Sequence, residues 1–186
     1  MKDSYIGQAW LVVLLSLCFG GALAGVQVML HERIEENKLA ETLSQIPVLV
    51  PGAEEGLVDT VAGQRVYRAL AGGRQIGWVV PGGGQGFADR IELLIGVDAE
   101  VARITGLYVL DQKETPGLGN KIVEEEWRKQ FSGKSTSKPL VVVKGGAKGE
   151  EEIDAITGAT ISSESVCRIV NRTLSRMRDE LIAEKR

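Results

Sequence analysis

The sequence is poor in the residues that bind metal clusters or form disulfide frameworks. It holds two cysteines and one histidine among 186 residues. Two cysteines cannot form a disulfide framework or supply a four-cysteine zinc or iron–sulfur site. The lone His31 stands at the end of an apolar run, where a structural role is favoured over metal binding or catalysis. We therefore expect no protein-ligated metal.

The chain also lacks a surplus of positive charge. It has 22 Lys and Arg against 25 Asp and Glu, which gives a formal net charge of −3. A protein that binds nucleic acid needs basic side chains to neutralise phosphates. We therefore expect no nucleic acid among its partners.

Charge of either sign is missing from Ser4 to Leu30, although charged residues make up 25% of the chain. Residues 9–30 read AWLVVLLSLCFGGALAGVQVML, with Ser16 and Gln27 as the only polar side chains. A helix that spans a bilayer needs about 20 mostly apolar residues. The run therefore predicts a transmembrane helix over residues 9–30 and argues against a wholly soluble protein.

Two alternatives for this run are a cleavable signal peptide and a buried core helix. Residues 22–24 read Ala-Leu-Ala, which imitates a signal-peptide cleavage site, and Lys2 precedes the apolar run. The run continues beyond that site to Leu30, however, which favours a retained anchor.

The flanking charges indicate an orientation for the anchor. Lys2 and the α-amino group precede it, whereas the acidic stretch HERIEENK follows it. Because positive charge accumulates on the cytoplasmic side of membrane spans, we expect residues 1–8 to be cytoplasmic. Residues 31–50 then form a helical linker, with its helix ending before Pro47, and residues 51–186 form an extracytoplasmic domain.

This domain begins with short β-like runs separated by glycine clusters. The runs cover residues 64–70, 75–80, 90–97 and 102–110, with glycine clusters at 72–73 and 82–86. A hairpin turn is expected near Asp98. The strands are therefore expected to lie next to one another in an antiparallel-rich sheet.

Helical patterns dominate the second half of the domain. A short helix is predicted over residues 119–131, a buried strand over 139–143, and a polar loop over 145–152. From Ser162 onward apolar residues recur at helical spacing, with Cys167 on or beside the stripe. The predicted fold class is α+β, with a single N-terminal transmembrane helix, one sheet domain and flanking helices.

One tempting motif lacks an essential residue. Gly133-Lys134-Ser135 imitates the end of a phosphate-binding P-loop, but Arg128 stands where the first glycine of that motif should be.

The segment Glu114-Thr115-Pro116-Gly117-Leu118-Gly119 joins a predicted strand to a predicted helix. Its proline and two glycines impose an unusual backbone path. Such a loop can bring backbone N–H groups close to a planar or anionic ligand. An ordinary strand-to-helix connection explains the same residues equally well.

The segment Asp154-Ala155-Ile156-Thr157-Gly158-Ala159-Thr160 stands directly ahead of the C-terminal helix. Thr160 would place its hydroxyl near the positive end of that helix, where a phosphate is stabilised. The alternative is a threonine that simply caps the helix.

Together, the two segments resemble the FMN-binding domain family whose members carry flavin covalently. DAITGAT is similar to the family signature D-x-x-[ST]-G-A-T, and ETPGLG resembles its second signature, a loop beside the flavin ring. GQGFADRIELLIGVD and ITGLYVLDQKETPGLGNKI further resemble the G subunits of Rnf ion-translocating electron-transport complexes. The related C subunit of the sodium-pumping NADH:quinone reductase shares this domain. The resemblance runs from about Gln75 into the C-terminal helix.

The resemblance implies a cofactor and a set of cofactor-binding residues. The FMN phosphate would be esterified to Thr160, and a flavin transferase would form the bond from FAD. The turn before that threonine would be shaped by Thr157, Gly158 and Ala159, with Asp154 belonging to the transferase recognition motif. The candidate ring contacts are Glu114, Thr115, Gly117, Leu118 and Gly119.

The resemblance also implies a function and a location. The chain would be a single-pass protein of the bacterial cytoplasmic (inner) membrane, in contact with lipid, with its FMN domain outside the cytoplasm. It would relay electrons within an Rnf-type ferredoxin:NAD oxidoreductase that moves Na⁺ or H⁺, with the other subunits as partners and no substrate of its own. The alternatives are a quinone-reductase subunit, a stand-alone FMN reductase, and an anchored assembly protein without flavin.

Overall fold

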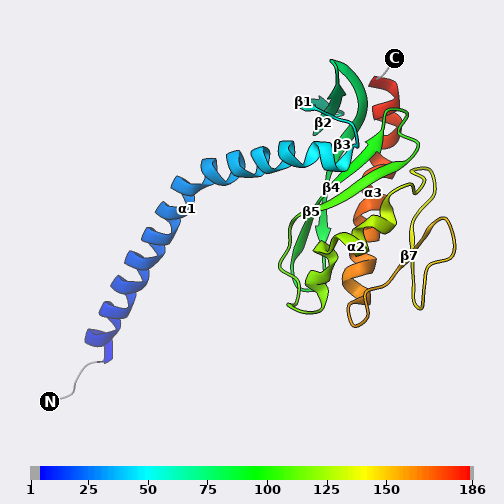
Figure 1. The fold of residues 1–186 in the computed structure, drawn as a ribbon. Helices are drawn as coiled ribbons and strands as arrows, with labels where there is room; N and C mark the ends of the chain where they lie inside the picture. The colour runs from blue at the N-terminus through cyan, green and yellow to red at the C-terminus, as the bar shows by residue number, and fades with distance from the viewer. Residues whose placement is uncertain (1–4, 185–186) are drawn as a thin grey trace. The chain divides into compact units, whose positions relative to one another are not determined.

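Figure 1 shows the fold in a computed structural model that describes residues 5–184. Part of the expected cytoplasmic segment, residues 1–8, lies outside this range. The chain forms two compact units, one ending at Glu41 and one beginning at Thr42.

Helix α1 (Tyr5–Leu49) supplies the first unit and continues into the second. From Ala9 onward it is long and apolar enough to cross a membrane. None of its most apolar stretch is buried inside the protein. A buried core helix is therefore excluded, and the exposed apolar surface fits a lipid environment.

The end of α1 continues through Pro47, so the predicted stop before this proline is wrong. Proline lacks a backbone N–H and therefore costs the helix one hydrogen bond in its last turns. The side chains of Ile46 and Leu49 are 0% and 1% exposed. Burial of the last turn thus outweighs the missing hydrogen bond.

A five-stranded antiparallel sheet forms the centre of the second unit, in the order β1-β2-β3-β4-β5. The strands are β1 (Glu55–Val61), β2 (Gln64–Ala71), β3 (Arg74–Gln85), β4 (Arg90–Asp98) and β5 (Ile104–Asp111). The four predicted runs match β2 to β5, and the predicted hairpin joins β4 to β5. The sequence did not predict β1, because its residues are mostly exposed and show no clear apolar alternation.

Strand β3 passes through Gly82, Gly83 and Gly84, which the sequence suggested as a break between elements. A Cβ at Gly82 would lie 2.6 Å from Thr173 Oγ1, and a Cβ at Gly84 would lie 2.8 Å from Ile169 Cγ1. These glycines therefore let the C-terminal helix approach the strand closely.

That helix, α3 (Thr160–Glu184), packs against the sheet, as Figure 1 shows. The predicted apolar stripe forms its buried face, together with the Cys167 thiol. The stripe residues are Val166, Ile169, Val170, Leu174, Met177 and Leu181. The prediction of a core-facing C-terminal helix is confirmed.

The last turn of α1 packs on the sheet where two glycines face each other across β4 and β5. Gly96 pairs with Gly106, and a Cβ on either would lie 2.5 or 3.0 Å from the Leu49 carbonyl oxygen. Thr105 donates a hydrogen bond of 2.6 Å from its hydroxyl to the same oxygen. The small residues thus bring the backbone of α1 directly onto the sheet.

The segment between β5 and α3 departs most from the predictions. Residues 119–131 form three short turns in place of one helix: η1 (Gly119–Val123), α2 (Glu125–Arg128) and η2 (Lys129–Phe131). Strand β6 (Val141–Val143) is short and partly exposed, and it pairs in parallel with β7 (Glu152–Asp154). The predicted strand over residues 139–143 is therefore present over 141–143 only, and the prediction that it is buried is wrong, because apolar composition alone does not report burial.

Candidate functional site

The two motif segments meet at one end of α3. The ETPGLG loop leads from β5 into η1, and the DAITGAT segment leads from β7 into α3. A hollow of about 350 Å³ lies between them, within the size range of small-molecule sites. Its lining residues are Phe87, Thr115, Leu118, Gly119, Gly158, Ala159, Thr160, Ile161 and Ser162.

Glu114 lies behind the wall of this hollow and does not line it. Its side chain is buried, with 4% of its surface exposed. Its Oε1 accepts hydrogen bonds from the backbone N–H groups of Phe87 (2.9 Å) and Ala88 (3.0 Å). Its Oε2 accepts a hydrogen bond of 2.5 Å from the Ser162 hydroxyl. Glu114 therefore joins the turn after β3, the ETPGLG loop and the first turn of α3.

Glycines allow these three segments to crowd around the carboxylate. A Cβ at Gly119 would lie 2.8 Å from Glu114 Oε2 and 2.7 Å from Ser162 Oγ. A Cβ at Gly86 would collide with Glu114 Oε1. Gly158 has a φ of +82°, in the left-handed region that favours glycine. The backbone path of the site thus depends on residues without side chains.

Thr160 is the first residue of α3. The backbone N–H of Ser163 donates to the Ala159 carbonyl at 3.1 Å, which places Ala159 in the capping position. The helix-capping alternative for Thr160 is therefore wrong. Alanine is a poor cap because its side chain has no hydrogen-bond acceptor.

The start of α3 is left with free hydrogen-bonding groups. Within residues 5–184, the hydroxyl of Thr160 has no hydrogen-bond partner. In the same range no acceptor serves the backbone N–H groups of Thr160, Ile161 and Ser162. These donors, together with the helix dipole, form a site suited to an anionic group such as a phosphate.

Large apolar side chains surround the hollow and remain exposed. The exposed fractions are 60% for Phe87, 45% for Leu118 and 51% for Ile161. An aromatic and two aliphatic side chains provide contact surface for the face of a planar ring. The hollow therefore combines an anion-binding end with an apolar rim.

Several predicted site residues lie away from the hollow. Thr157 and Gly117 are exposed in the flanking turns and do not line it. Asp154 lies in β7, where its Oδ1 accepts a hydrogen bond of 3.1 Å from the Gly146 N–H. Its carbonyl oxygen accepts a hydrogen bond of 2.8 Å from Trp127 Nε1. Asp154 is thus anchored on the segment that leads to Thr160.

Three lining residues were not predicted from the sequence, namely Phe87, Ile161 and Ser162. Phe87 adjoins the glycine cluster at 82–86, which was interpreted as a break between strands. Ile161 and Ser162 directly follow the DAITGAT motif, and their place in the first turn of α3 is the signal that could have found them.

Comparison with known proteins identifies this part of the chain. Residues 86–175 match the FMN-binding domain family. The chain is 42% identical to the G subunit of the Na⁺-translocating ferredoxin:NAD⁺ oxidoreductase complex of Acetobacterium woodii, over 59% of this chain and 53% of that protein. It is 28% identical to the G subunit of an ion-translocating oxidoreductase complex of Pseudoalteromonas atlantica, over 93% of this chain and 88% of that protein.

A solved structure shares the fold. The crystal structure of Shewanella oneidensis NqrC matches with a TM-score of 0.61 at 22% identity, over 72% of this chain and 71% of that one. The predicted α+β class, with one apolar N-terminal helix ahead of an antiparallel-rich sheet domain, is therefore confirmed.

The stretch that matches the FMN-binding domain family, residues 86–175, contains the hollow, the ETPGLG loop and the start of α3. The chain resembles G subunits of ion-translocating oxidoreductase complexes, although it spans only about half the length of the Acetobacterium relative. The residues present fit FMN, because the free donors at the start of α3 suit its phosphate and the apolar rim suits its ring system.

Proposed function

We propose that this protein is a membrane-anchored flavoprotein subunit that carries FMN on Thr160 and relays electrons within an Rnf-type ion-translocating ferredoxin:NAD oxidoreductase complex. The observation that carries the proposal is the hollow that Thr160 and the uncapped start of α3 line together with residues of the ETPGLG loop. The names of the related G subunits support the assignment to this kind of complex.

The proposed attachment needs one bond-forming step. Thr160 Oγ1 attacks the flavin-side phosphate of FAD, the bond between the two phosphates breaks, AMP leaves, and the hydroxyl proton is released. A separate flavin transferase would catalyse this exchange, with Asp154 as part of the motif that it recognises. The free hydroxyl and the positive end of α3 favour this position over the exposed Thr157.

The remaining residues bind and orient the cofactor. When bound, FMN accepts and passes on one or two electrons. The backbone donors of Thr160, Ile161 and Ser162 would hold the phosphate. Thr115, Leu118 and Gly119 would lie along the ring on one side of the hollow, and Gly158 and Ala159 would leave room beside the phosphate. Glu114 would position these segments from behind, and Gly117 and Thr157 would shape the turns.

The exposed rim fits a role in electron transfer better than one in catalysis on a small molecule. Phe87, Leu118 and Ile161 leave one side of the hollow open to solvent, so a partner carrier can come close to the ring. Among residues 5–184, the side chains that line the hollow offer no proton donor other than the hydroxyls of Thr115, Thr160 and Ser162. We therefore expect electron relay without turnover of a separate substrate.

The anchor would be a retained single-pass helix over residues 9–30, continued by the helical linker over 31–50. The FMN domain, residues 51–186, would lie outside the cytoplasm, with Lys2 and the α-amino group on the cytoplasmic side of the span. Protease treatment of spheroplasts should then digest the domain, whereas digestion only after lysis would contradict this orientation.

A subunit of a sodium-pumping quinone reductase remains the second candidate, supported by the shared fold with NqrC. The neighbouring genes would distinguish an Rnf-type complex from a quinone reductase, since the subunits of each complex are encoded together.

The flavin itself is tested by denaturing electrophoresis of protein made together with a flavin transferase. A fluorescent band at the mass of this chain is expected for wild type and is lost in Thr160→Ala. Absence of the band from wild type would favour an anchored assembly protein without flavin.

A further inference from the structure

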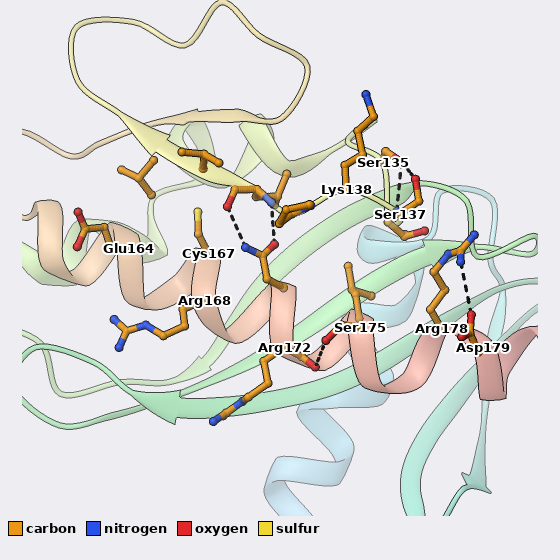
Figure 2. Close-up of a pocket in the computed structure, with 17 residues that line it drawn as sticks. Ser135, Ser137, Lys138, Glu164, Cys167, Arg168, Arg172, Ser175, Arg178 and Asp179 are labelled. Atoms are coloured by element: carbon orange, nitrogen blue, oxygen red, sulfur yellow. Dashed lines mark hydrogen bonds and ion pairs between the residues drawn. The ribbon is translucent and has the colours of Figure 1, made fainter.

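A second and larger concavity runs along α3, between the helix and residues 135–142, and Figure 2 shows it in close-up. Its volume is about 850 Å³. Apolar side chains, including Leu140, Val142 and Leu174, form part of the lining. It begins at Glu164, one helical turn beyond Thr160, and extends away from the FMN site to Asp179.

The lining of this groove carries an excess of positive charge. Lys138, Arg168, Arg172 and Arg178 line it, against the two carboxylates Glu164 and Asp179. Two of these cations are ion-paired, Lys138 with Glu151 at 2.7 Å and Arg178 with Asp179 at 3.4 Å. The whole chain has a net charge of −3, so the groove has the opposite sign to the protein. A positively charged groove on a protein of negative net charge attracts negatively charged partners to that face.

Two of the arginines have no carboxylate partner among residues 5–184. Arg168 Nη2 donates to the Ser165 hydroxyl at 3.0 Å, and Arg172 Nη2 donates to the carbonyl of Gly83. In Figure 2 both side chains project from the side of α3 that is turned away from residues 135–142, so they lie at the rim of the groove. Their positive charges are therefore not neutralised by a carboxylate within residues 5–184.

A neighbouring hollow of about 520 Å³ extends the basic surface. It shares Lys138 and Arg178 with the groove and adds Arg103 and Lys134, against Glu150. Arg103 Nη1 donates to the carbonyl of Gly133 at 2.9 Å, and Lys134 Nζ donates to the carbonyl of Gly149 at 3.3 Å. The Gly133-Lys134-Ser135 motif, which failed as a P-loop, therefore contributes to a basic surface.

We propose that this groove, lined by residues 135–142 and by α3 from Glu164 to Asp179, docks an acidic segment of a partner protein. Carboxylates of that segment would pair with Arg168 and Arg172, and its apolar side chains would contact the exposed Val141 and the partly exposed Val142. A concave lining that mixes apolar side chains, hydroxyls and cations suits a polypeptide better than the broad surface of an anionic membrane. Such charge complementarity speeds encounter and orients the partner.

The groove lies beside the FMN site along the same helix. A partner docked there would therefore be held close to the open rim of the flavin hollow, as a carrier that exchanges electrons requires. The docking proposal does not depend on the flavin, because the basic lining is present whether or not Thr160 is modified.

The test uses the full-length protein in nanodiscs of neutral lipid and a fluorescent peptide of alternating Glu and Val. We expect this peptide to bind, with an affinity that falls as salt is raised, and a peptide of alternating Lys and Val to bind much more weakly. Arg168→Glu with Arg172→Glu should lower the affinity about tenfold, whereas Arg168→Gln with Arg172→Gln should give a smaller loss.

The matched control reverses two exposed arginines that line neither hollow, Arg65→Glu with Arg74→Glu. It has the same net charge as the groove variant and should bind as wild type does. Equal losses in both variants, binding that does not respond to salt, or no peptide binding would overturn the proposal. So would binding to vesicles containing phosphatidylglycerol in the absence of peptide binding, which would assign the surface to the membrane.

Discussion

The hydroxyl of Ser162 donates a hydrogen bond of 2.5 Å to Glu114 Oε2 and thereby joins the two motif segments of the FMN site. Both residues are buried, at 2% and 4% exposure. One belongs to the first turn of α3 and the other to the loop after β5. The geometry of the site therefore depends on a polar contact that lies beneath its surface.

Replacement of Glu114 by alanine should destabilise the domain by about 2–4 kcal/mol. The change leaves the Ser162 hydroxyl and the N–H groups of Phe87 and Ala88 without their acceptor in a buried position. Urea denaturation measures the loss. Glu126→Ala, an exposed control in α2, should stay within about 0.5 kcal/mol of wild type. Similar values for both variants would refute the structural role of Glu114.

Gly119→Ala should destabilise the domain by about 1–3 kcal/mol and weaken FMN incorporation. Its Cβ would lie within 2.8 Å of both Glu114 Oε2 and Ser162 Oγ, so the loop has to move. The control in the same loop is Gly117→Asn. Gly117 has a φ of +75° and open space around it, a conformation that asparagine accepts at little cost. If the control is the more damaging of the two, the close packing around Glu114 is not what constrains the loop.

Asp154→Asn tests whether Asp154 is needed for recognition by the flavin transferase or for folding of the domain. Asparagine keeps an oxygen to accept the hydrogen bond from Gly146, so the melting temperature should stay within a few degrees of wild type. Flavin attachment by the transferase should nevertheless fall if the enzyme reads the negative charge. Flavin absorbance per protein measures the effect, with the exposed Asp179→Asn as the charge-matched control. Full flavin content in Asp154→Asn would remove this residue from the recognition motif.

Cys167 should remain unreactive in the folded protein. Burial raises the pKa of its thiol to about 12, with a smaller contribution from the charge of Glu164. Because the folded pKa is raised, the stabilisation is fully present below about pH 9, where the unfolded thiol is also neutral, and is lost as the pH rises toward 12. In a Cys18→Ala background, iodoacetamide at pH 9 should label Cys167 only after unfolding. Rapid labelling of the folded protein would contradict its burial.

The sequence predicted the elements whose pattern is local. Strands β2 to β5 and the stripe of α3 follow from apolar spacing, and the motifs marked both sides of the site. The glycines of β3 were misinterpreted because they allow α3 to pack closely on the strand. This contact joins residues that are far apart in the sequence, so no local pattern indicates it. The same holds for Pro47, which the packing of Leu49 on Gly96 and Gly106 keeps within the helix.

In the site, too, the residues that belong to local motifs were predicted, whereas those placed by contacts between distant segments were not. Thr160 and the ETPGLG loop are local motifs, whereas Phe87 reaches the hollow only because Glu114 holds its backbone. The burial of Glu114 itself depends on Ser162, a partner that no local pattern indicates.

The central claim is that FMN is attached to Thr160, and intact mass spectrometry with peptide mapping tests it most directly. Protein made together with the flavin transferase should carry the mass of one FMN less one water, on the peptide that contains both Thr157 and Thr160. Thr157→Ala should keep this added mass and Thr160→Ala should lose it. Added mass that persists in Thr160→Ala, or that disappears only in Thr157→Ala, would contradict the account.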